Sequence, residues 1–192
     1  MSCTLVTGPA RSGKSRFAET LARASGGAVT YVATARVDSG DAQWTARLAR
    51  HAASRPPDWR VVETARPDAQ TLIDVARAAR PDETLLVESL GTWLADRMSR
   101  HVAASEDAAA LDADILEAEA ALAVDALLAS RARAIVVGEE VGWGLVAPYA
   151  AGRVFSDVLG RAQQRLAARA SPVYLVVAGF ALDLCAVGKR VD

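Results

Sequence analysis

The residues with the clearest chemistry form the segment Gly8–Ser15, which has the pattern G-x-x-x-x-G-K-S. Its glycines let the backbone turn so that consecutive N–H groups can point at a phosphate without obstruction by side chains. In such a loop the lysine, here Lys14, contacts the β- and γ-phosphates, and the hydroxyl of Ser15 is a ligand for Mg²⁺. The segment therefore predicts a binding site for a nucleoside triphosphate with Mg²⁺.

A histidine among arginines is the second candidate. His51 lies between Arg47, Arg50 and Arg55, directly before a break at Pro56-Pro57. A neutral imidazole can act in catalysis, and the arginines can contact phosphate. A histidine at a helix end can equally be an exposed residue that interacts favourably with the helix dipole. The spacing alone leaves both roles open.

Carboxylates follow two apolar runs. Glu88 comes after Leu-Leu-Val, where many phosphate-loop enzymes carry an acidic residue that holds Mg²⁺ through water. Glu139 and Glu140 come after a second such run. Each of these carboxylates could instead cap the end of its strand. Trp93 and Trp143 could likewise face a large ligand or pack in the core.

Strand-like and helix-like segments alternate along the chain and must position these residues. Apolar runs predict strands near 4–7, 29–34, 60–63, 84–88, 134–138 and 173–177, the last of them the final strand. Helices are expected near 15–24, 41–51, 67–79, 91–104, 105–130 and 152–170. The helix over 105–130 is expected to pack through Leu111, Ile115, Ala118 and Leu122. A mobile polar loop is expected after the helix near 91–104, with His101 exposed.

This alternation predicts an α/β protein with a mostly parallel central sheet flanked by helices, a three-layer P-loop NTPase-like fold in a single domain over 1–192. Ligands of such sheets gather at the carboxyl ends of the strands. The phosphate loop, the segment after Thr34, and Glu63, Glu88 and Glu139 are therefore expected to converge on one edge.

Composition excludes several classes of function. The net charge of −1 gives no reason to expect nucleic acid or an anionic membrane surface as a partner. The longest apolar run, Val173–Ala181, is too short for a transmembrane segment. The two cysteines, Cys3 and Cys185, form no metal-spaced pair and are expected to be core residues of a cytoplasmic protein.

Several longer motifs extend the phosphate loop. The pattern T-G-x-x-R-S-G-K-S-x-x-A-E covers 7–19, Y-x-A-T covers 31–34, and R-L-x-x-H-x-x-x-R-P-x-x-W-x-x-x-E covers 47–63. E-V-G-x-G-L-V follows at 140–146, and F-x-D-x-x-G-x-x-x-Q at 155–164. In these motifs the chain resembles the bifunctional adenosylcobinamide kinase / adenosylcobinamide-phosphate guanylyltransferase family of cobalamin biosynthesis. The likeness runs nearly end to end, and the pattern around His51 is its specific part.

The resemblance implies two reactions. A nucleoside triphosphate, ATP or GTP, phosphorylates adenosylcobinamide. His51 then attacks the α-phosphate of GTP, holds GMP, and passes it to adenosylcobinamide phosphate, giving adenosyl-GDP-cobinamide. Lys14 and His51 are the implied catalytic residues, Mg²⁺ is the implied cofactor at Ser15, and a homotrimer is the implied assembly.

The resemblance also implies a set of nucleotide contacts. They fall on Gly8, Pro9, Ala10, Arg11, Ser12, Gly13, Lys14, Ser15, Thr34, Ala35, Arg36, Ala52, Ala53, Ser54, Arg55, Glu63 and Glu88. This chain departs from the family pattern at Arg50 and Ala52 beside the histidine. It also departs at Glu139, where relatives have asparagine, and at Gln163. Whether this chain makes the same secondary contacts as its relatives is therefore left open by the sequence.

Two other functions remain compatible with the phosphate loop. One is a simple small-molecule kinase in which His51 is structural. The other is a non-catalytic nucleotide-binding switch whose loops become ordered around the γ-phosphate.

Overall fold

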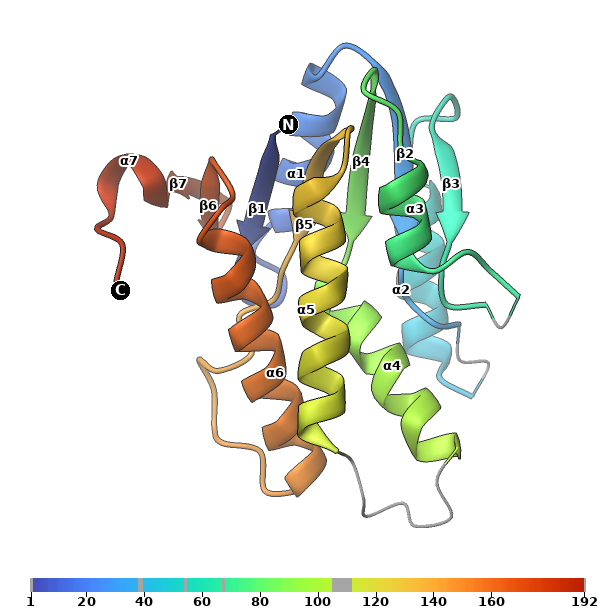
Figure 1. Ribbon diagram of the computed structural model, residues 1–192, viewed down its shortest axis with the longest axis vertical. Helices are drawn as coiled ribbons and strands as arrows, with labels where there is room; N and C mark the ends of the chain where they lie inside the picture. Colours follow the sequence, from blue (N-terminus) through green and yellow to red (C-terminus); the bar gives the residue numbers. More distant parts are fainter. Residues whose placement is uncertain (1, 38–39, 54, 67, 105–111, 192) are drawn as a thin grey trace.

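A seven-stranded sheet forms the centre of the computed structural model, which describes residues 2–37, 40–53, 55–66, 68–104 and 112–191 (Figure 1). Its strand order is β3-β2-β4-β5-β1-β6-β7. The strands are β1 (Cys3–Thr7), β2 (Ala28–Ala33), β3 (Arg60–Glu63), β4 (Glu83–Glu88), β5 (Arg133–Val137), β6 (Val173–Val177) and β7 (Phe180–Asp183). All pairs from β3 to β6 are parallel, which confirms the predicted α/β class.

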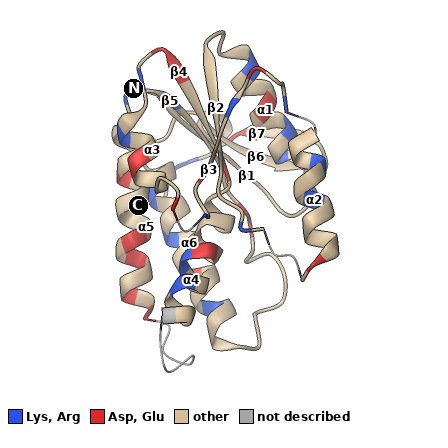
Figure 2. Ribbon diagram, turned by 90° about the vertical axis from the view of Figure 1, so that its right-hand side faces the viewer, with Lys and Arg blue, Asp and Glu red and all other residues tan. Residues whose placement is uncertain are grey.

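Helices cover both faces of this sheet. They are α1 (Lys14–Ala24), α2 (Ala42–Ala53), α3 (Leu72–Ala78), α4 (Leu90–Ala104), α5 (Ala113–Ala129), α6 (Ala150–Ala167) and α7 (Leu184–Val187). Figure 2 shows α1 and α2 on one side of the strands and α3 and α5 on the other. Two clusters of buried side chains fill the two interfaces, so the sheet has an apolar layer on each face.

The sheet contains one strand more than the sequence predicts. The last strand was expected at 173–177, but β7 follows it and pairs antiparallel with β6. Ala178 and Gly179 both have positive φ, 51° and 84°, and make a two-residue turn between the strands. The sequence concealed this turn because apolar residues continue on both sides of it.

The third helix is shorter than the predicted 67–79. It begins after Thr71, whose hydroxyl accepts a hydrogen bond from the backbone N–H of Asp74 at 3.2 Å. The Asp74 carboxylate accepts one from the Thr71 N–H at 3.1 Å, which completes a capping box. Of the predicted extra residues, position 67 lies outside those described.

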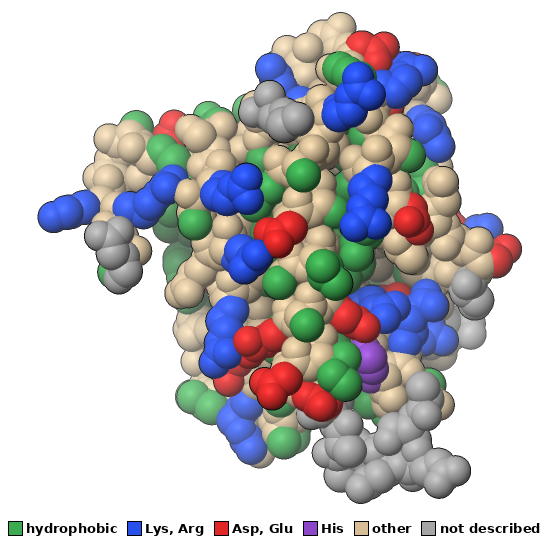
Figure 3. All heavy atoms as spheres, viewed as in Figure 1, with side chains coloured by type: hydrophobic (Ala, Val, Ile, Leu, Met, Phe, Trp, Pro, Cys, Tyr) green, Lys and Arg blue, Asp and Glu red, His purple; other side chains and the backbone are tan. Residues whose placement is uncertain are grey.

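The predicted packing face of α5 was wrong. Ile115 is 48% exposed and Leu122 57% exposed, whereas Leu116 and Leu127 are buried; Leu111 lies outside the described residues. Figure 3 shows apolar side chains on the outer face of this helix, among acidic ones. Because α5 is apolar on most of its circumference, sequence periodicity did not single out the face that packs between α3, α6 and the sheet.

The structure also shows the surroundings of the two cysteines, His101 and Trp93. Cys3 is buried as predicted, but Cys185 is exposed on α7. His101 is only partly exposed, because its Nε2 lies 3.1 Å from Glu119 Oε1. Trp93 is a core residue, 7% exposed. The loop expected after α4 falls on residues 105–111, outside those described. Among the described helices, none has the length and apolar character to span a membrane.

Candidate active site

The phosphate loop lies between the carboxyl end of β1 and the start of α1. Gly13, with φ of 98°, and Arg11, with φ of 59°, occupy the left-handed region that this turn requires. A side chain at Gly8 would collide with the carbonyl oxygen of Val176. Gly13, the N-cap residue of α1, has no side chain to cap the helix, and the N–H of Lys14 donates to Ser12 Oγ at 3.4 Å. The dipole at this end of α1 favours a phosphate.

Lys14 lies at the start of α1 and is only 5% exposed. Its Nζ donates to the backbone carbonyl of Pro9 at 3.3 Å, so the loop itself orients the ammonium group. A buried cation at the amino end of a helix is a strong site for phosphate oxygens.

Ser15 and Glu88 bring together the oxygen ligands that Mg²⁺ prefers. Glu88 is the last residue of β4, and its Oε1 accepts a hydrogen bond from the Ser15 hydroxyl at 2.7 Å. Burial raises the pKa of Glu88 to about 7, and the hydrogen bond from Ser15 only partly opposes this effect. A hydroxyl and a carboxylate beside a phosphate loop fit a magnesium ion that takes its remaining ligands from phosphate and water.

A polar network connects the ends of β2, β4 and β5. Thr34 is 1% exposed, and its hydroxyl donates to the carbonyl of Ser89 at 2.7 Å. Ser89 Oγ donates to Glu139 Oε1, and the N–H of Gly91 donates to Glu139 Oε2 at 2.9 Å. Burial raises the pKa of Glu139 above its ordinary value. These bonds hold Glu139 at the start of α4, facing the phosphate loop.

Helix α2 carries the candidate histidine. Trp44, Arg47 and His51 are spaced three and four residues apart, which places them on one face. No described residue of α2 is fully buried, so this face is not packed in the core. Burial lowers the pKa of His51, and the positive charges of Arg47, Arg55 and Arg50 lower it further, as does Lys14. These effects favour the neutral imidazole, and the contribution of Lys14 places His51 within electrostatic range of the phosphate loop.

Arg55 extends this positive region. Its guanidinium lies over the ring of Tyr31, 3.9 Å from the ring centroid. Its Nε is buried and has no hydrogen-bond partner among the residues that the structure describes. An unpaired buried donor is costly, and a phosphate oxygen of a bound nucleotide would satisfy it.

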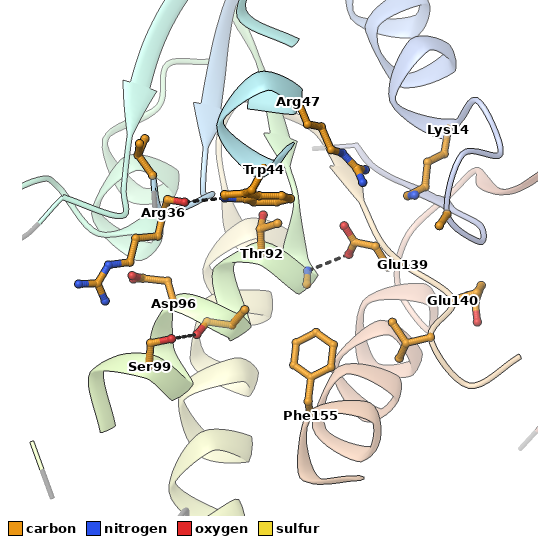
Figure 4. A pocket seen from close by; sticks show the side chains of 15 residues that line it. Lys14, Arg36, Trp44, Arg47, Thr92, Asp96, Ser99, Glu139, Glu140 and Phe155 are labelled. Carbon is orange, nitrogen blue, oxygen red and sulfur yellow. Dashed lines mark hydrogen bonds between the residues drawn. The ribbon is translucent and has the colours of Figure 1, made fainter. Parts of the chain in front are cut away.

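One cavity of about 910 Å³ joins these elements (Figure 4). Lys14, Arg47 and Glu139 line it near the phosphate loop, and Trp44 and Phe155 line it farther away. Its volume is at the upper end of the range for small-molecule sites.

The other predicted nucleotide contacts lie at different distances from this centre. Arg36 lines the cavity, and Ala35 precedes it in the segment after β2. Ala52 and Ala53 end α2 directly after His51, and position 54 lies outside the described residues. Glu63 is at the expected strand end, exposed, and paired with Arg66 at 2.5 Å. Its role as a nucleotide contact stays a prediction.

Sequence reasoning missed the cavity residues Trp44, Thr92 and Asp96. A signal for Trp44 was present, because it shares the helical spacing of Arg47 and His51. Thr92 and Asp96 lie on α4 one turn apart, and their helix contains no recognisable chemical motif. Phe155 was noted only as part of a family motif.

The parallel sheet, the glycine loop after β1 and the lysine at the start of α1 define a P-loop nucleotide-binding protein. Residues 4–184 match the model of the family described as CobU: Cobinamide kinase / cobinamide phosphate guanyltransferase. The chain belongs to this family. Membership confirms the family and the enzyme class, a bifunctional kinase and guanyltransferase, that the sequence predicts.

Curated relatives agree with the family model. The "Bifunctional adenosylcobalamin biosynthesis protein CobP" of Pseudomonas aeruginosa is 39% identical over 94% of this chain and 95% of its own length. The "Bifunctional adenosylcobalamin biosynthesis protein CobU" of Salmonella typhimurium is 36% identical over 94% of this chain and 98% of its own. The Escherichia coli protein of the same name is 35% identical with the same coverage.

A solved structure shows the same fold at low sequence identity. An ATPase from the type III secretion system of pathogenic bacteria is similar over 98% of this chain, with a TM-score of 0.58 and 10% identity. The chain spans 59% of that ATPase, and the likeness concerns the fold alone.

Proposed function

We propose that this protein phosphorylates adenosylcobinamide and then transfers GMP from GTP to adenosylcobinamide phosphate through a guanylylated His51. The observation that supports it best is the meeting of two elements at one cavity. Lys14 of the phosphate loop and Arg47 of the histidine helix both line it, and the charge of Lys14 reaches His51.

The kinase step uses the phosphate loop. The acceptor's hydroxyl oxygen gives up its proton to water and forms a bond to the γ-phosphorus of ATP or GTP. The bond to the bridging oxygen breaks, and the nucleoside diphosphate leaves with that electron pair. Lys14 and the N–H groups of α1 stabilise the charge on the phosphates. Ser15 and Glu88 would hold Mg²⁺, which neutralises phosphate charge when bound.

The guanylyl step uses the histidine helix. The neutral imidazole of His51 attacks the α-phosphorus of GTP, a P–N bond forms, and pyrophosphate leaves. A phosphate oxygen of the acceptor then attacks the same phosphorus, and the P–N bond breaks to give the GDP-linked product. Arg47 and Arg55 lie where they can neutralise the α-phosphate during both displacements.

The decisive experiment uses GTP labelled at the α-phosphate. Wild-type protein with Mg²⁺ is expected to retain label after denaturation, in a bond that is labile to acid and stable to alkali. His51→Ala should retain none. His101→Ala is the matched control, since it removes the other of the two histidines, which pairs with Glu119 on α5. Folded wild-type protein that takes up no label would refute the covalent step.

The same assay separates the rival functions. A simple kinase would phosphorylate cobinamide without forming protein-bound GMP, and a switch would bind GTP without either reaction. Lys14→Ala is expected to reduce cobinamide phosphorylation by about 100-fold or more, because the lysine contacts the transferred phosphate. An unchanged rate in folded Lys14→Ala would contradict the role of the loop.

We propose further that the protein is a homotrimer, as the family resemblance implies. Support comes from β7, an edge strand that carries Phe180, 76% exposed, and Leu182, 50% exposed. In Figure 1 this strand and α7 project from the body of the molecule. Apolar edge strands of this kind are commonly covered by another chain. The cytoplasmic location stays a prediction, which cell fractionation can test.

A further inference from the structure

The cavity has two chemically different ends. Near the phosphate loop its wall carries Lys14, Arg47 and Glu139. Figure 4 shows Trp44 and Phe155 on opposite walls farther from Lys14, and Val141 also lines the cavity. Phosphates suit the first part, whereas an apolar group suits the second.

The two aromatic walls are held in place without a ligand. Trp44 Nε1 donates to the carbonyl of Arg36 at 2.9 Å, which fixes the indole between α2 and the segment after β2. Phe155 is partly buried and packs against the core from α6. Rings that are already ordered lose little conformational entropy when an apolar group binds against them.

A buried acceptor lies at the end of the cavity away from Lys14 (Figure 4). Asp96 is 6% exposed, and its Oδ2 accepts a hydrogen bond from Arg100 Nε at 2.7 Å. Its Oδ1 has no hydrogen-bond partner in the described part of the chain. An unpaired buried carboxylate oxygen calls for a donor, and an amide N–H is a suitable one.

We propose that this end of the cavity is the acceptor subsite, in which Trp44 and Phe155 contact the apolar rim of the substrate's corrin ring. The inference rests on the proposed function and assigns a place to its acceptor. The rim of a corrinoid carries methyl groups and amide side chains, so the aromatic walls contact the methyl groups and Asp96 accepts from an amide. Its hydroxyl-bearing arm then extends toward Lys14, where the phosphate is transferred.

Two substitutions test the subsite. Phe155→Ala removes an aromatic wall. Val141→Glu places a charge on the apolar part of the lining at a residue that is 38% exposed, so the fold tolerates it. The matched control is Val146→Glu, on the same loop, 81% exposed and not among the residues that line the cavity. Equilibrium dialysis with cobinamide measures acceptor binding, and labelling by α-labelled GTP measures the nucleotide end.

Both subsite variants are expected to raise the Kd for cobinamide by about tenfold or more, with GTP labelling within about twofold of wild type. Val146→Glu should leave both values unchanged. An unchanged Kd in folded Val141→Glu overturns the inference, as does a parallel loss of GTP labelling. Wild-type protein that takes up label without binding cobinamide also overturns it. Protein that binds cobinamide but takes up no label refutes the covalent step while the subsite stands.

Discussion

The chemistry of His51 depends on the positively charged side chains around it. His51 has three arginines and Lys14 in its electrostatic surroundings, and burial adds to their effect on its pKa. All of these contributions favour the neutral, nucleophilic imidazole. The same cations can neutralise the α-phosphate in the proposed attack by the imidazole.

A pH profile tests this arrangement. Since burial and the neighbouring arginines lower the pKa of His51, guanylylation should stay constant from pH 8 to below 6.5 and fall only at lower pH, where the imidazole is protonated. Arg47→Ala removes one of the positive charges and should move the inflection to higher pH, by up to about one unit. The control is Arg80→Ala, which removes an exposed ion pair with Asp82. An inflection above 6.5 in wild type would contradict the assignment.

Glu88 shows the opposite shift. Its pKa is raised from 4.5 to about 7, so the folded protein without metal binds a proton that the unfolded chain releases. The stability that this proton confers is present below pH 4.5 and is lost as the pH rises through 7.

Glu88→Gln should therefore stabilise the metal-free protein at pH 8, by at most about 3 kcal/mol, with the difference vanishing toward pH 4.5. Denaturant unfolding at both pH values measures it. The same variant should lose kinase activity, because the amide is a poorer partner for Mg²⁺. A variant that is less stable than wild type at pH 8 would show that the Ser15–Glu88 hydrogen bond outweighs the burial of charge.

At the scale of elements, α2 is the unusual helix. It is amphipathic, yet none of its described residues is fully buried, and the face with Trp44 and Arg47 lines the cavity. Helices normally use such a face to join the core. Here that face contributes to the candidate site instead, which suits a helix that carries the proposed nucleophile.

Helix α3 has a more ordinary structural task, and its start can be tested. Thr71→Ala removes the capping box and should lower the free energy of unfolding by about 1 kcal/mol. Thr71→Ser keeps the hydroxyl and should restore most of that loss. Urea unfolding of the three proteins gives the comparison, and equal midpoints would mean that Thr71 does not stabilise the helix.

At the scale of the whole molecule, the exposed edge of the sheet matters most. Among the described strands, β7 pairs only with β6, and Val187 of α7 is also exposed, at 72%. Leu182→Glu with Phe180→Glu should convert the proposed trimer to monomers, measured by sedimentation velocity. Ile115→Glu with Leu122→Glu, on the outer face of α5, is the matched control and should leave the assembly intact. A wild-type monomer would refute the trimer.

The order of the strands brings the predicted site together. Residues after β1, β2, β4 and β5 meet because parallel strands place their carboxyl ends at one edge. This convergence followed from the alternation of apolar runs and helices, so it was predictable. The turn at Ala178–Gly179 and the packing face of α5 were not predictable. A continuous apolar sequence does not show where the chain reverses or which face of a helix packs against its neighbours.

The sequence by itself determined the phosphate loop, the histidine helix and the family. Each of these is a contiguous pattern whose spacing carries its own chemistry, as in Gly8–Ser15. Only the tertiary structure decided which side chains share the cavity. Trp44, Asp96 and Phe155 lie on three helices far apart in the chain, and their meeting depends on how those helices pack at the end of the sheet. Local spacing cannot encode that packing, because it is set by contacts between distant segments.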